Sequence, residues 1–255
     1  MKLAILQSDY AGLTPDQRLT RLESIAADTD ADLLLCPELF LSGYAIPGQL
    51  AGLAEPSNGP SAQRIAAIAR SSKTAIAYGY PERADGKPFN AMQVIAPDGT
   101  TLAHHRKSVL PTGFEPSCFQ PGSGSAMFPY LGLNIALLIC YEIEFPEAAR
   151  NAAQSGAQLI LAPTALGHQW GVVAHKILPT RAFENGVYVA YANHAGTEGG
   201  IKFLGASCII DPMGNDLARA GDRAQLITAE VDPAQVKKAQ DRLPYLKDRS
   251  RLFFM

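Results

Sequence analysis

Short apolar segments rich in branched residues alternate along the chain with stretches in which apolar residues recur at helical spacing. The apolar segments are typical of buried strands, and proline, glycine and aspartate turns follow several of them. The helical stretches begin behind residues that favour a helix start, such as Pro15, Ser61 and Pro146. The pattern therefore predicts a mixed α/β protein. The predicted strands are residues 3–7, 32–38, 74–80, 91–96, 134–140, 158–163, 187–193, 207–211 and 225–231, and the predicted helices are residues 15–28, 61–71, 146–155 and 172–184.

The order of these elements occurs twice. Each half alternates strand and helix twice and continues with three strands, the last two joined by a turn, PDGT at 97–100 and PMGN at 212–215. Because helices would cover only one face of each sheet, the remaining faces must pack against each other. We expect two pseudo-symmetric β-α-β-α-β-β-β halves in a four-layer α-β-β-α sandwich. They would form a single domain over residues 1–255, with residues 243–255 as a C-terminal tail.

Composition narrows the classes of partner. The 255 residues carry a formal net charge of −2, so no basic face is expected for nucleic acid or for anionic membranes. Four cysteines without a CxxC pair and five histidines without HExxH spacing argue against a metal site and a disulfide framework. The apolar run in the first residues, MKLAILQSDY, is too short for the core of a signal peptide. No uncharged apolar run is long enough to span a membrane. We expect a cytoplasmic protein that acts on a small molecule without a cofactor.

Three polar residues follow predicted strands, where α/β proteins tend to bind ligands. Glu38 follows DLLLCP, Lys107 follows the last strand of the first half, and Cys140 ends NIALLI and enters CYEIEFPE. Taken singly, the glutamate could end a turn, the lysine could be an exposed charge and the cysteine could be a small core residue. Carboxylates beside a buried thiol raise its pKa, so a reactive Cys140 requires a nearby cation, and Lys107 supplies one.

Thiol, base and cation together predict a nucleophilic site for acyl transfer. We expect Cys140 to attack an amide carbonyl while Glu38 accepts the thiol proton and passes it to the departing ammonia. Lys107 and the backbone N–H of Tyr141 would stabilise the oxyanion. Water activated by Glu38 would then cleave the thioester to a carboxylic acid.

Three segments of the sequence also carry a family resemblance. They read CPELFLSGY (36–44), HRKSVLP (105–111) and ICYEIEFPE (139–147). These segments resemble the signature blocks of the nitrilase superfamily of carbon–nitrogen hydrolases, whose members have a Glu-Lys-Cys triad on an α-β-β-α sandwich. The resemblance places the triad on Glu38, Lys107 and Cys140. It places on Glu115 a second glutamate that orients the substrate and the lysine.

Two positions depart from the family pattern. Many members have histidine where Val109 stands and aspartate where Glu142 stands, so the hydrogen bonds around the site are expected to differ. The resemblance also implies a homodimer or higher homo-oligomer that often exchanges C-terminal segments. The tail LPYLKDRSRLFFM is therefore expected to dock on a partner copy.

Glu144 is the position that bears on the substrate. Relatives whose substrates carry a carboxylate often have arginine there, and an acidic residue would instead favour a cationic group, as in an amino-amide. A structural ion pair with Arg150 or Arg181 is an equally good interpretation. Three segments, CYEIEFPE, GYPER (79–83) and the tail, resemble those of one branch of aliphatic amidases. This branch includes 5-aminopentanamidase and the R-stereoselective amidases.

Several alternatives stay open at this point. A nitrilase or an N-carbamoyl amidohydrolase would use the same chemistry on another substrate. A binding or scaffold protein would keep Cys140 for packing only, a thiol redox protein would need Cys36 as a resolving cysteine, and a Cys-His dyad would leave Lys107 without a role. Aromatic residues are candidates for the pocket wall, although core packing is their commoner role. These are Tyr44, Tyr141, Phe145 and Trp170.

Overall fold

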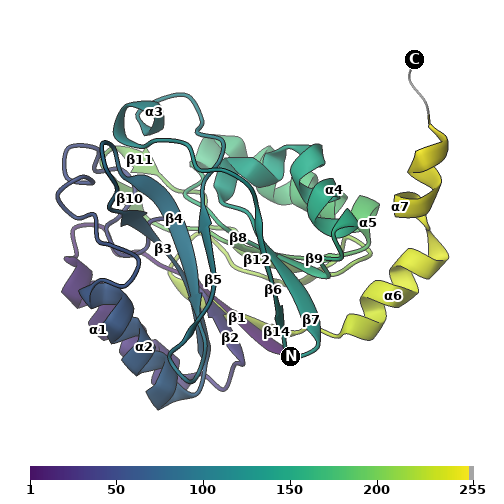
Figure 1. Cartoon of the computed structure of the whole chain (residues 1–255), viewed down its shortest axis with the longest axis horizontal. Helices are drawn as coiled ribbons and strands as arrows, with labels where there is room; N and C mark the ends of the chain where they lie inside the picture. The colour runs from purple at the N-terminus through teal and green to yellow at the C-terminus, as the bar shows by residue number, and fades with distance from the viewer. Residues whose placement is uncertain (253–255) are drawn as a thin grey trace.

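Two six-stranded β-sheets form the centre of the molecule (Figure 1). This computed structural model describes residues 1–252. The first sheet consists, in spatial order, of β14 (Gln225–Glu230), β1 (Lys2–Gln7), β2 (Leu33–Leu35), β3 (Ala75–Glu82), β4 (Phe89–Ile95) and β5 (Thr101–Arg106). The second consists of β13 (Asp216–Arg219), β12 (Cys208–Ile210), β9 (Tyr188–Ala192), β8 (Leu159–Pro163), β7 (Leu133–Leu137) and β6 (Ala126–Tyr130). A separate hairpin is formed by β10 (Thr197–Glu198) and β11 (Ile201–Lys202).

The two sheets share one topology, which confirms the predicted repeat. Strands β1, β2 and β3 are parallel and continue into antiparallel β4 and β5. Strands β7, β8 and β9 are likewise parallel and continue into antiparallel β12 and β13. Each sheet also has a sixth strand, β14 beside β1 and β6 beside β7. The sequence pattern gives no sign of β6, because AMFPY contains Pro129, which only an edge strand tolerates.

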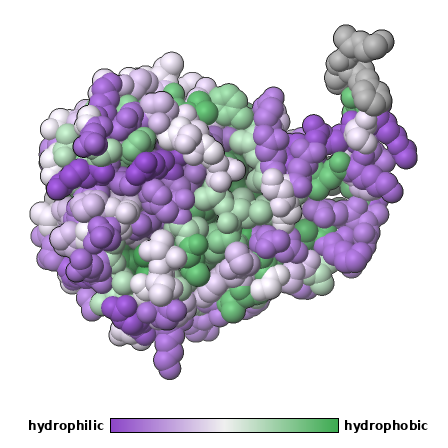
Figure 2. All heavy atoms as spheres, in the orientation of Figure 1, coloured by the Kyte–Doolittle hydropathy of each residue, from purple (hydrophilic) through white to green (hydrophobic). Residues whose placement is uncertain are grey.

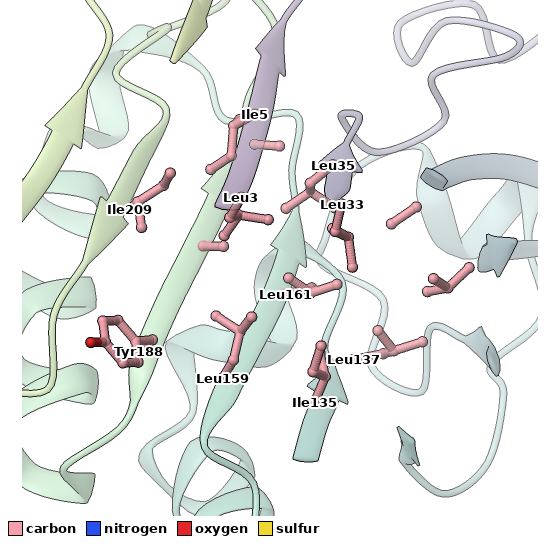
Figure 3. Packing of buried hydrophobic residues seen from close by; sticks show 14 of the residues in the cluster. Leu3, Ile5, Leu33, Leu35, Ile135, Leu137, Leu159, Leu161, Tyr188 and Ile209 are labelled. Carbon is pink, nitrogen blue, oxygen red and sulfur yellow. The ribbon is translucent and has the colours of Figure 1, made fainter. Parts of the chain in front are cut away.

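Helices cover the outer face of each sheet (Figure 1). The first sheet packs on α1 (Pro15–Asp28) and α2 (Pro60–Ser72), and the second packs on α4 (Pro146–Gln154) and α5 (Leu178–Asn185). The inner faces meet in a core of branched apolar side chains (Figure 3). This core includes Leu3, Ile5, Leu33 and Leu35 from the first sheet and Ile135, Leu137, Leu159 and Leu161 from the second. The arrangement confirms the four-layer α-β-β-α sandwich.

Local sequence explains where the covering helices begin. Thr14 forms a capping box with Gln17 at the start of α1, and a proline stands in the first turn of α1, α2 and α4. The predicted helix over 172–184 is two elements instead, a π-helical turn at Val173–Ile177 followed by α5. Pro179 stands at the start of α5 and lacks the N–H that an uninterrupted α-helix would use there.

Two predicted strands end earlier than expected. Strand β2 stops at Leu35 rather than at residue 38, and β7 stops at Leu137 rather than at residue 140. In both places the chain turns through a left-handed residue, Leu39 with φ 48° and Cys140 with φ 50°. Non-glycine residues adopt this conformation at a cost of about 1–3 kcal/mol, and functional sites are where such strain gathers.

The C-terminal residues form an arm that leaves the sandwich (Figure 1), and Figure 2 shows mostly hydrophilic residues over it. It consists of α6 (Pro233–Arg242), α7 (Tyr245–Asp248) and a short 3-10 turn. The Tyr245 ring lies 6.0 Å from that of Phe183 on α5, and Leu246 packs against the same layer. The described part of the tail thus contacts its own chain, while residues 253–255 lie outside the described residues. No helix within residues 1–252 is long and apolar enough to cross a bilayer.

Candidate active site

Four side chains singled out in the sequence come together in one buried site. Glu38 lies in the loop after β2, Lys107 follows β5, Glu115 begins the short helix α3 (Glu115–Cys118), and Cys140 begins the 3-10 helix after β7. None of the four is more than 7% exposed. The first sheet therefore supplies the two carboxylates and the lysine, and the second sheet supplies the thiol.

Lys107 is fully buried and links two carboxylates. Its Nζ donates to Glu38 Oε1 at 2.7 Å and to both oxygens of Glu115 at 2.8 and 2.9 Å. Burial acts to lower the pKa of Lys107, but the negative charges around it, that of Glu38 first, outweigh it, and the pKa is raised. The lysine is therefore an ammonium ion with all of its protons engaged, not an exposed surface charge.

Glu38 has one occupied and one free carboxylate oxygen. Oε1 accepts hydrogen bonds from Lys107 and from Asn90 Nδ2 at 2.8 Å. Oε2 is buried and has no partner among the described residues. Burial raises the pKa of Glu38 despite the opposing charge of Lys107. A carboxylate with a raised pKa and a free oxygen can accept and return a proton, which is what a general base needs.

Asn90 was missed in the sequence analysis. It stands in β4, and besides its bond to Glu38 its carbonyl oxygen accepts the backbone N–H of Lys107 at 2.8 Å. It thus holds both members of the ion pair. Its only signal in the sequence is a polar residue inside a buried strand, which does not by itself indicate a catalytic role.

Close packing fixes the Glu38 loop. The backbone of residues 37–39 lies against Gly79 of β3, where a Cβ would overlap the Leu39 nitrogen and the Pro37 oxygen. Only glycine allows this close approach, which explains why the GYPER segment begins with a glycine. From the other half of the chain, His194 Nε2 contacts the Glu38 carbonyl oxygen at 2.7 Å.

Cys140 sits at the sharp turn between β7 and the 3-10 helix. Burial raises its pKa most, followed by the charge of Glu38, while Lys107 and a hydrogen bond from Thr164 lower it. The balance is a raised pKa, so Lys107 offsets the surrounding acid only in part. The thiol therefore keeps its proton in the resting site, and a base would have to remove it before the sulfur could act as a nucleophile.

Glu142, the first of the acidic residues after Cys140, is a structural cross-link. Its carboxylate accepts the backbone N–H of Ile139 at 2.6 Å, that of Ser108 at 2.8 Å, and a bond from His105 Nε2 at 2.8 Å. Burial acts to raise the pKa of Glu142, but these donors outweigh it and the pKa is lowered. The carboxylate joins the turn before Cys140 to the segment after Lys107 and stays charged.

Glu144 lines the pocket and has no ion-pair partner among the described residues. Arg181 donates to the backbone carbonyl of Glu144 at 2.7 Å, while its charge pairs with Glu184 at 3.1 Å. Arg150 also pairs with Glu184, at 3.6 Å. Burial is the main cause that raises the pKa of Glu144. The two ion pairs considered from the sequence are absent from this part of the chain, and the carboxylate is free to meet a ligand.

A pocket of about 470 Å³ leads to Cys140. Tyr44 donates from its hydroxyl to Glu115 Oε1 at 2.6 Å, and Trp170 is 56% exposed. Phe145 instead packs its ring on Tyr141, with centroids 4.9 Å apart. The lining includes Tyr44, Phe114, Glu115, Cys140, Tyr141, Glu144, Leu166, Trp170 and Ile201. Three of the four candidate aromatic residues thus contribute to the wall.

Cys36 lies in a different core from Cys140. It packs between the first sheet and its covering helices, whereas Cys140 borders the core between the sheets. All four cysteines are free. The geometry therefore gives no support to Cys36 as a resolving cysteine. Within residues 1–252, no three His, Cys, Asp or Glu side chains are grouped as metal ligands.

Comparison with known proteins adds independent findings. The carbon-nitrogen hydrolase family model matches residues 2–241. A Pseudomonas protegens protein named as a hydrolase is 45% identical over 255 residues, covering 98% of this chain and 89% of the relative. An (R)-stereoselective amidase from a Pseudomonas species is 34% identical, covering 91% and 83%. The omega-amidase of Mus musculus is 30% identical, covering 97% and 94%.

Solved structures similar to this chain are also amidases. An amidase from Nesterenkonia AN1 superposes with a TM-score of 0.86 at 34% identity, covering 99% of this chain and 97% of that chain. One mutant of that amidase has been solved in complex with butyramide. Another shows covalent addition of the acetamide moiety of fluoroacetamide at the active-site cysteine.

Proposed function

The chain belongs to the carbon–nitrogen hydrolase family, and we propose that within it the protein is an amidase that converts a small aliphatic amide to a carboxylic acid and ammonia. The observation that carries this proposal is the free Oε2 of Glu38, a carboxylate whose other oxygen is held by Lys107. The charges of both side chains act on Cys140, which lines the pocket. The butyramide and acetamide structures of the Nesterenkonia amidase support a small aliphatic substrate.

Acylation begins when Cys140 attacks the amide carbonyl. Its proton passes to the free oxygen of Glu38, a C–S bond forms and the carbonyl oxygen becomes an oxyanion. Lys107 and the backbone N–H of Tyr141, which has no acceptor among the described residues, stabilise that charge. Because Lys107 makes two bonds to Glu115, one can be given to the oxyanion while Glu115 stays paired.

Collapse of the tetrahedral intermediate breaks the C–N bond. Glu38 donates its proton to the departing nitrogen, so ammonia leaves and a thioester remains on Cys140. A water molecule then gives a proton to Glu38 and attacks the thioester. The C–S bond breaks, the carboxylic acid is released and the proton of Glu38 returns to the sulfur.

The substrate we propose carries a cationic group, as 5-aminopentanamide does. Glu144 lies in the pocket with Cys140, is partly buried and forms no salt bridge within residues 1–252, so only the more distant charges of Lys107 and Arg181 act on it. A buried carboxylate without a partner is unfavourable, and a substrate ammonium ion would supply the missing charge. The (R)-stereoselective amidase among the relatives supports an amide substrate but does not identify it.

Ammonia release from a panel of substrates tests both levels of the proposal. The panel contains 5-aminopentanamide, pentanamide, glutaramate, a carbamoyl amino acid and pentanenitrile. Wild type is compared with Cys140→Ala, Glu144→Gln and, as a matched control, Glu147→Gln, which removes an exposed carboxylate outside the pocket. We expect Cys140→Ala to release no ammonia. We expect Glu144→Gln to lower kcat/KM by about 10- to 100-fold for 5-aminopentanamide only, as one charge pair is worth roughly 1.5–3 kcal/mol.

The other outcomes separate the remaining alternatives. An equal loss on 5-aminopentanamide and pentanamide would make Glu144 a structural residue. Turnover confined to the nitrile or to the carbamoyl substrate would replace the amidase by a nitrilase or an N-carbamoyl amidohydrolase. No ammonia from any substrate would leave a binding protein on the same scaffold.

A further inference from the structure

The sulfur of Cys140 has a single hydrogen-bond donor among the described residues. This donor is the hydroxyl of Thr164, at 3.0 Å. Thr164 directly follows β8, and its oxygen accepts a bond of 2.9 Å from the hydroxyl of Tyr191 on β9. Both residues are completely buried. The ends of two neighbouring parallel strands therefore carry a chain of two hydroxyl groups that ends on the nucleophile.

The Tyr191 hydroxyl determines the direction in which the two hydroxyl groups donate their hydrogen bonds. Within residues 1–252, the Tyr191 hydroxyl has Thr164 as its only partner, so its proton is satisfied only by donation to the threonine oxygen. The single hydroxyl proton of Thr164 is then left for the sulfur of Cys140. The reverse direction would leave the Tyr191 proton buried without an acceptor, which is unfavourable.

We propose that Thr164 is a catalytic residue that stabilises the thiolate of Cys140, and that Tyr191 positions the Thr164 hydroxyl for donation. A hydrogen bond to an ionised acceptor is about twice as strong as one between neutral groups, so this bond favours the thiolate over the thiol. Such help is needed because Glu38 and Glu115 both disfavour a negative sulfur. Lys107, the other favourable group, is already bonded to those two carboxylates.

The same bond acts at two points of the reaction. It strengthens as the proton of Cys140 moves to Glu38 and negative charge develops on the sulfur. It strengthens again in deacylation, when the C–S bond breaks and the sulfur leaves with the electron pair before it regains the proton from Glu38. No further reactant is involved. The inference rests on the proposed function, in which Cys140 is the nucleophile.

Alkylation by iodoacetamide tests the thiol directly, without any amide substrate. The rate of Cys140 alkylation is followed by peptide mass spectrometry from pH 6 to pH 11 in wild type, Thr164→Val, Thr164→Ser and Tyr191→Phe. Cys118, which is partly exposed, reports on general reactivity in the same samples. Thr74→Val is the matched control, because its buried hydroxyl bonds to Ala31 and Ser72 far from the thiol in the fold.

We expect the apparent pKa of Cys140 to rise by about one unit in Thr164→Val. The alkylation rate below that pKa should fall about three- to fourfold, because the smaller thiolate fraction is offset in part by a more nucleophilic thiolate. Tyr191→Phe should shift it in the same direction by less, because the Thr164 hydroxyl becomes free to rotate. Thr164→Ser keeps the hydroxyl and should match wild type, and Thr74→Val should show no shift. The profile of Cys118 should not change in any variant.

An unchanged Cys140 profile in folded Thr164→Val would overturn the proposal. If that variant does not fold, Tyr191→Phe tests the proposal instead, because it removes a single oxygen atom. An unchanged Cys140 profile in Tyr191→Phe would show that the two hydroxyl groups do not act on the thiol. These outcomes are distinct from a failure of the proposed function. A protein that releases no ammonia from any amide can still show the thiol shift, and an active amidase can lack it.

Discussion

At the scale of single residues, the protonation state of His194 is connected to the position of Glu38. Its Nε2 contacts the carbonyl oxygen of Glu38 at 2.7 Å, and its Nδ1 contacts the Ser8 hydroxyl at 3.2 Å. A neutral ring satisfies both contacts, with Nε2 as donor and Nδ1 as acceptor. Burial lowers the pKa of His194 to about 4, so the ring is neutral when the protein is folded at neutral pH.

We predict that stability decreases as the pH falls from about 6.5 to about 4. A histidine in an unfolded chain titrates near pH 6.5, whereas His194 in the folded protein titrates near 4. Between these values only the unfolded state binds the proton. The contribution of His194 is therefore complete above pH 6.5 and is lost toward pH 4, by an amount on the order of 3 kcal/mol. Urea unfolding at several pH values measures this change.

His194→Gln is the comparison that isolates the effect. Glutamine can still donate to Glu38 but does not titrate, so its free energy of unfolding should be lower at pH 7 and should vary less above pH 4.5. Despite burial, Arg106 and His104 lower the pKa of Glu82 from 4.5 to about 2, so its contribution is lost below about pH 4.5, outside the range in which the two proteins are compared. Parallel curves for wild type and His194→Gln would contradict the prediction.

At the scale of elements, the β10–β11 hairpin holds the segment that follows Glu38. Glu198 of the hairpin accepts the backbone N–H groups of Tyr44 and Ala45 at 2.6 and 2.7 Å, and its other oxygen accepts from Arg18 at 3.3 Å. Gly199 has φ 53°, and a Cβ there would overlap the Ala45 oxygen. The hairpin therefore fixes Tyr44, whose hydroxyl bonds to the Glu115 carboxylate.

Glu198→Gln should disturb both stability and catalysis. In either orientation the new amide group points an N–H at another donor, Arg18 on one side or the Tyr44 and Ala45 amides on the other. We expect a loss of about 2 kcal/mol in the free energy of unfolding. We also expect kcat/KM per active site to fall about tenfold. Looser positioning of Tyr44 and Glu115 would raise the activation free energy, and a rise of about 1.4 kcal/mol gives that factor.

Two measurements separate these effects. Thermal unfolding gives the stability, and kcat/KM is normalised to the thiol content found by titration. Glu55→Gln is the control, because Glu55 caps α2 through Ser61, does not line the pocket and should lose stability alone. In a double-mutant cycle, Tyr44→Phe should have less effect in the Glu198→Gln background than in wild type. Additive effects would show that the hairpin acts independently of Tyr44.

The elements also show which parts of the site the sequence can predict. Glu38, Lys107 and Cys140 were predictable because reactive residue types follow buried strands, and Glu115 was predictable only through the family resemblance. Asn90, Thr164 and His194 carry groups that occur in many protein cores, and only their neighbours give them a role. The ends of β2 and β7 were missed because left-handed turns in non-glycine residues leave no pattern in the sequence.

At the scale of the whole molecule, the site is divided between the two halves. Glu38, Lys107 and Glu115 come from the first half, and Cys140 and Glu144 come from the second. The core between the sheets (Figure 3) therefore sets the distance between Glu38 and Cys140. Substitutions deep in that core are expected to affect catalysis through this distance as well as through stability.

We propose that the protein is a homodimer to which the tail contributes. The tail carries two large side chains that its own chain covers only in part, Tyr245 at 42% and Leu252 at 70% exposure, and docking on a partner copy would bury both. Deleting residues 243–255 should shift the mass measured by light scattering from dimer to monomer. Val109→Ser, which removes an exposed apolar side chain from the first half of the chain, should leave the mass unchanged. A monomeric mass for the full chain would contradict the proposal.

The pairing of β1 with β14 has a consequence for synthesis of the protein in the cell. All six residues of β1 pair with β14, from Lys2 with Glu230 to Gln7 with Gln225, and the amino group of Met1 donates to the Val231 carbonyl at 3.0 Å. Strand β1 therefore leaves the ribosome roughly 10–45 s before its partner β14 at ordinary translation rates. During that time its edge is open to other nascent chains. A chain released before residue 225 retains that open edge and is a substrate for chaperones and proteases.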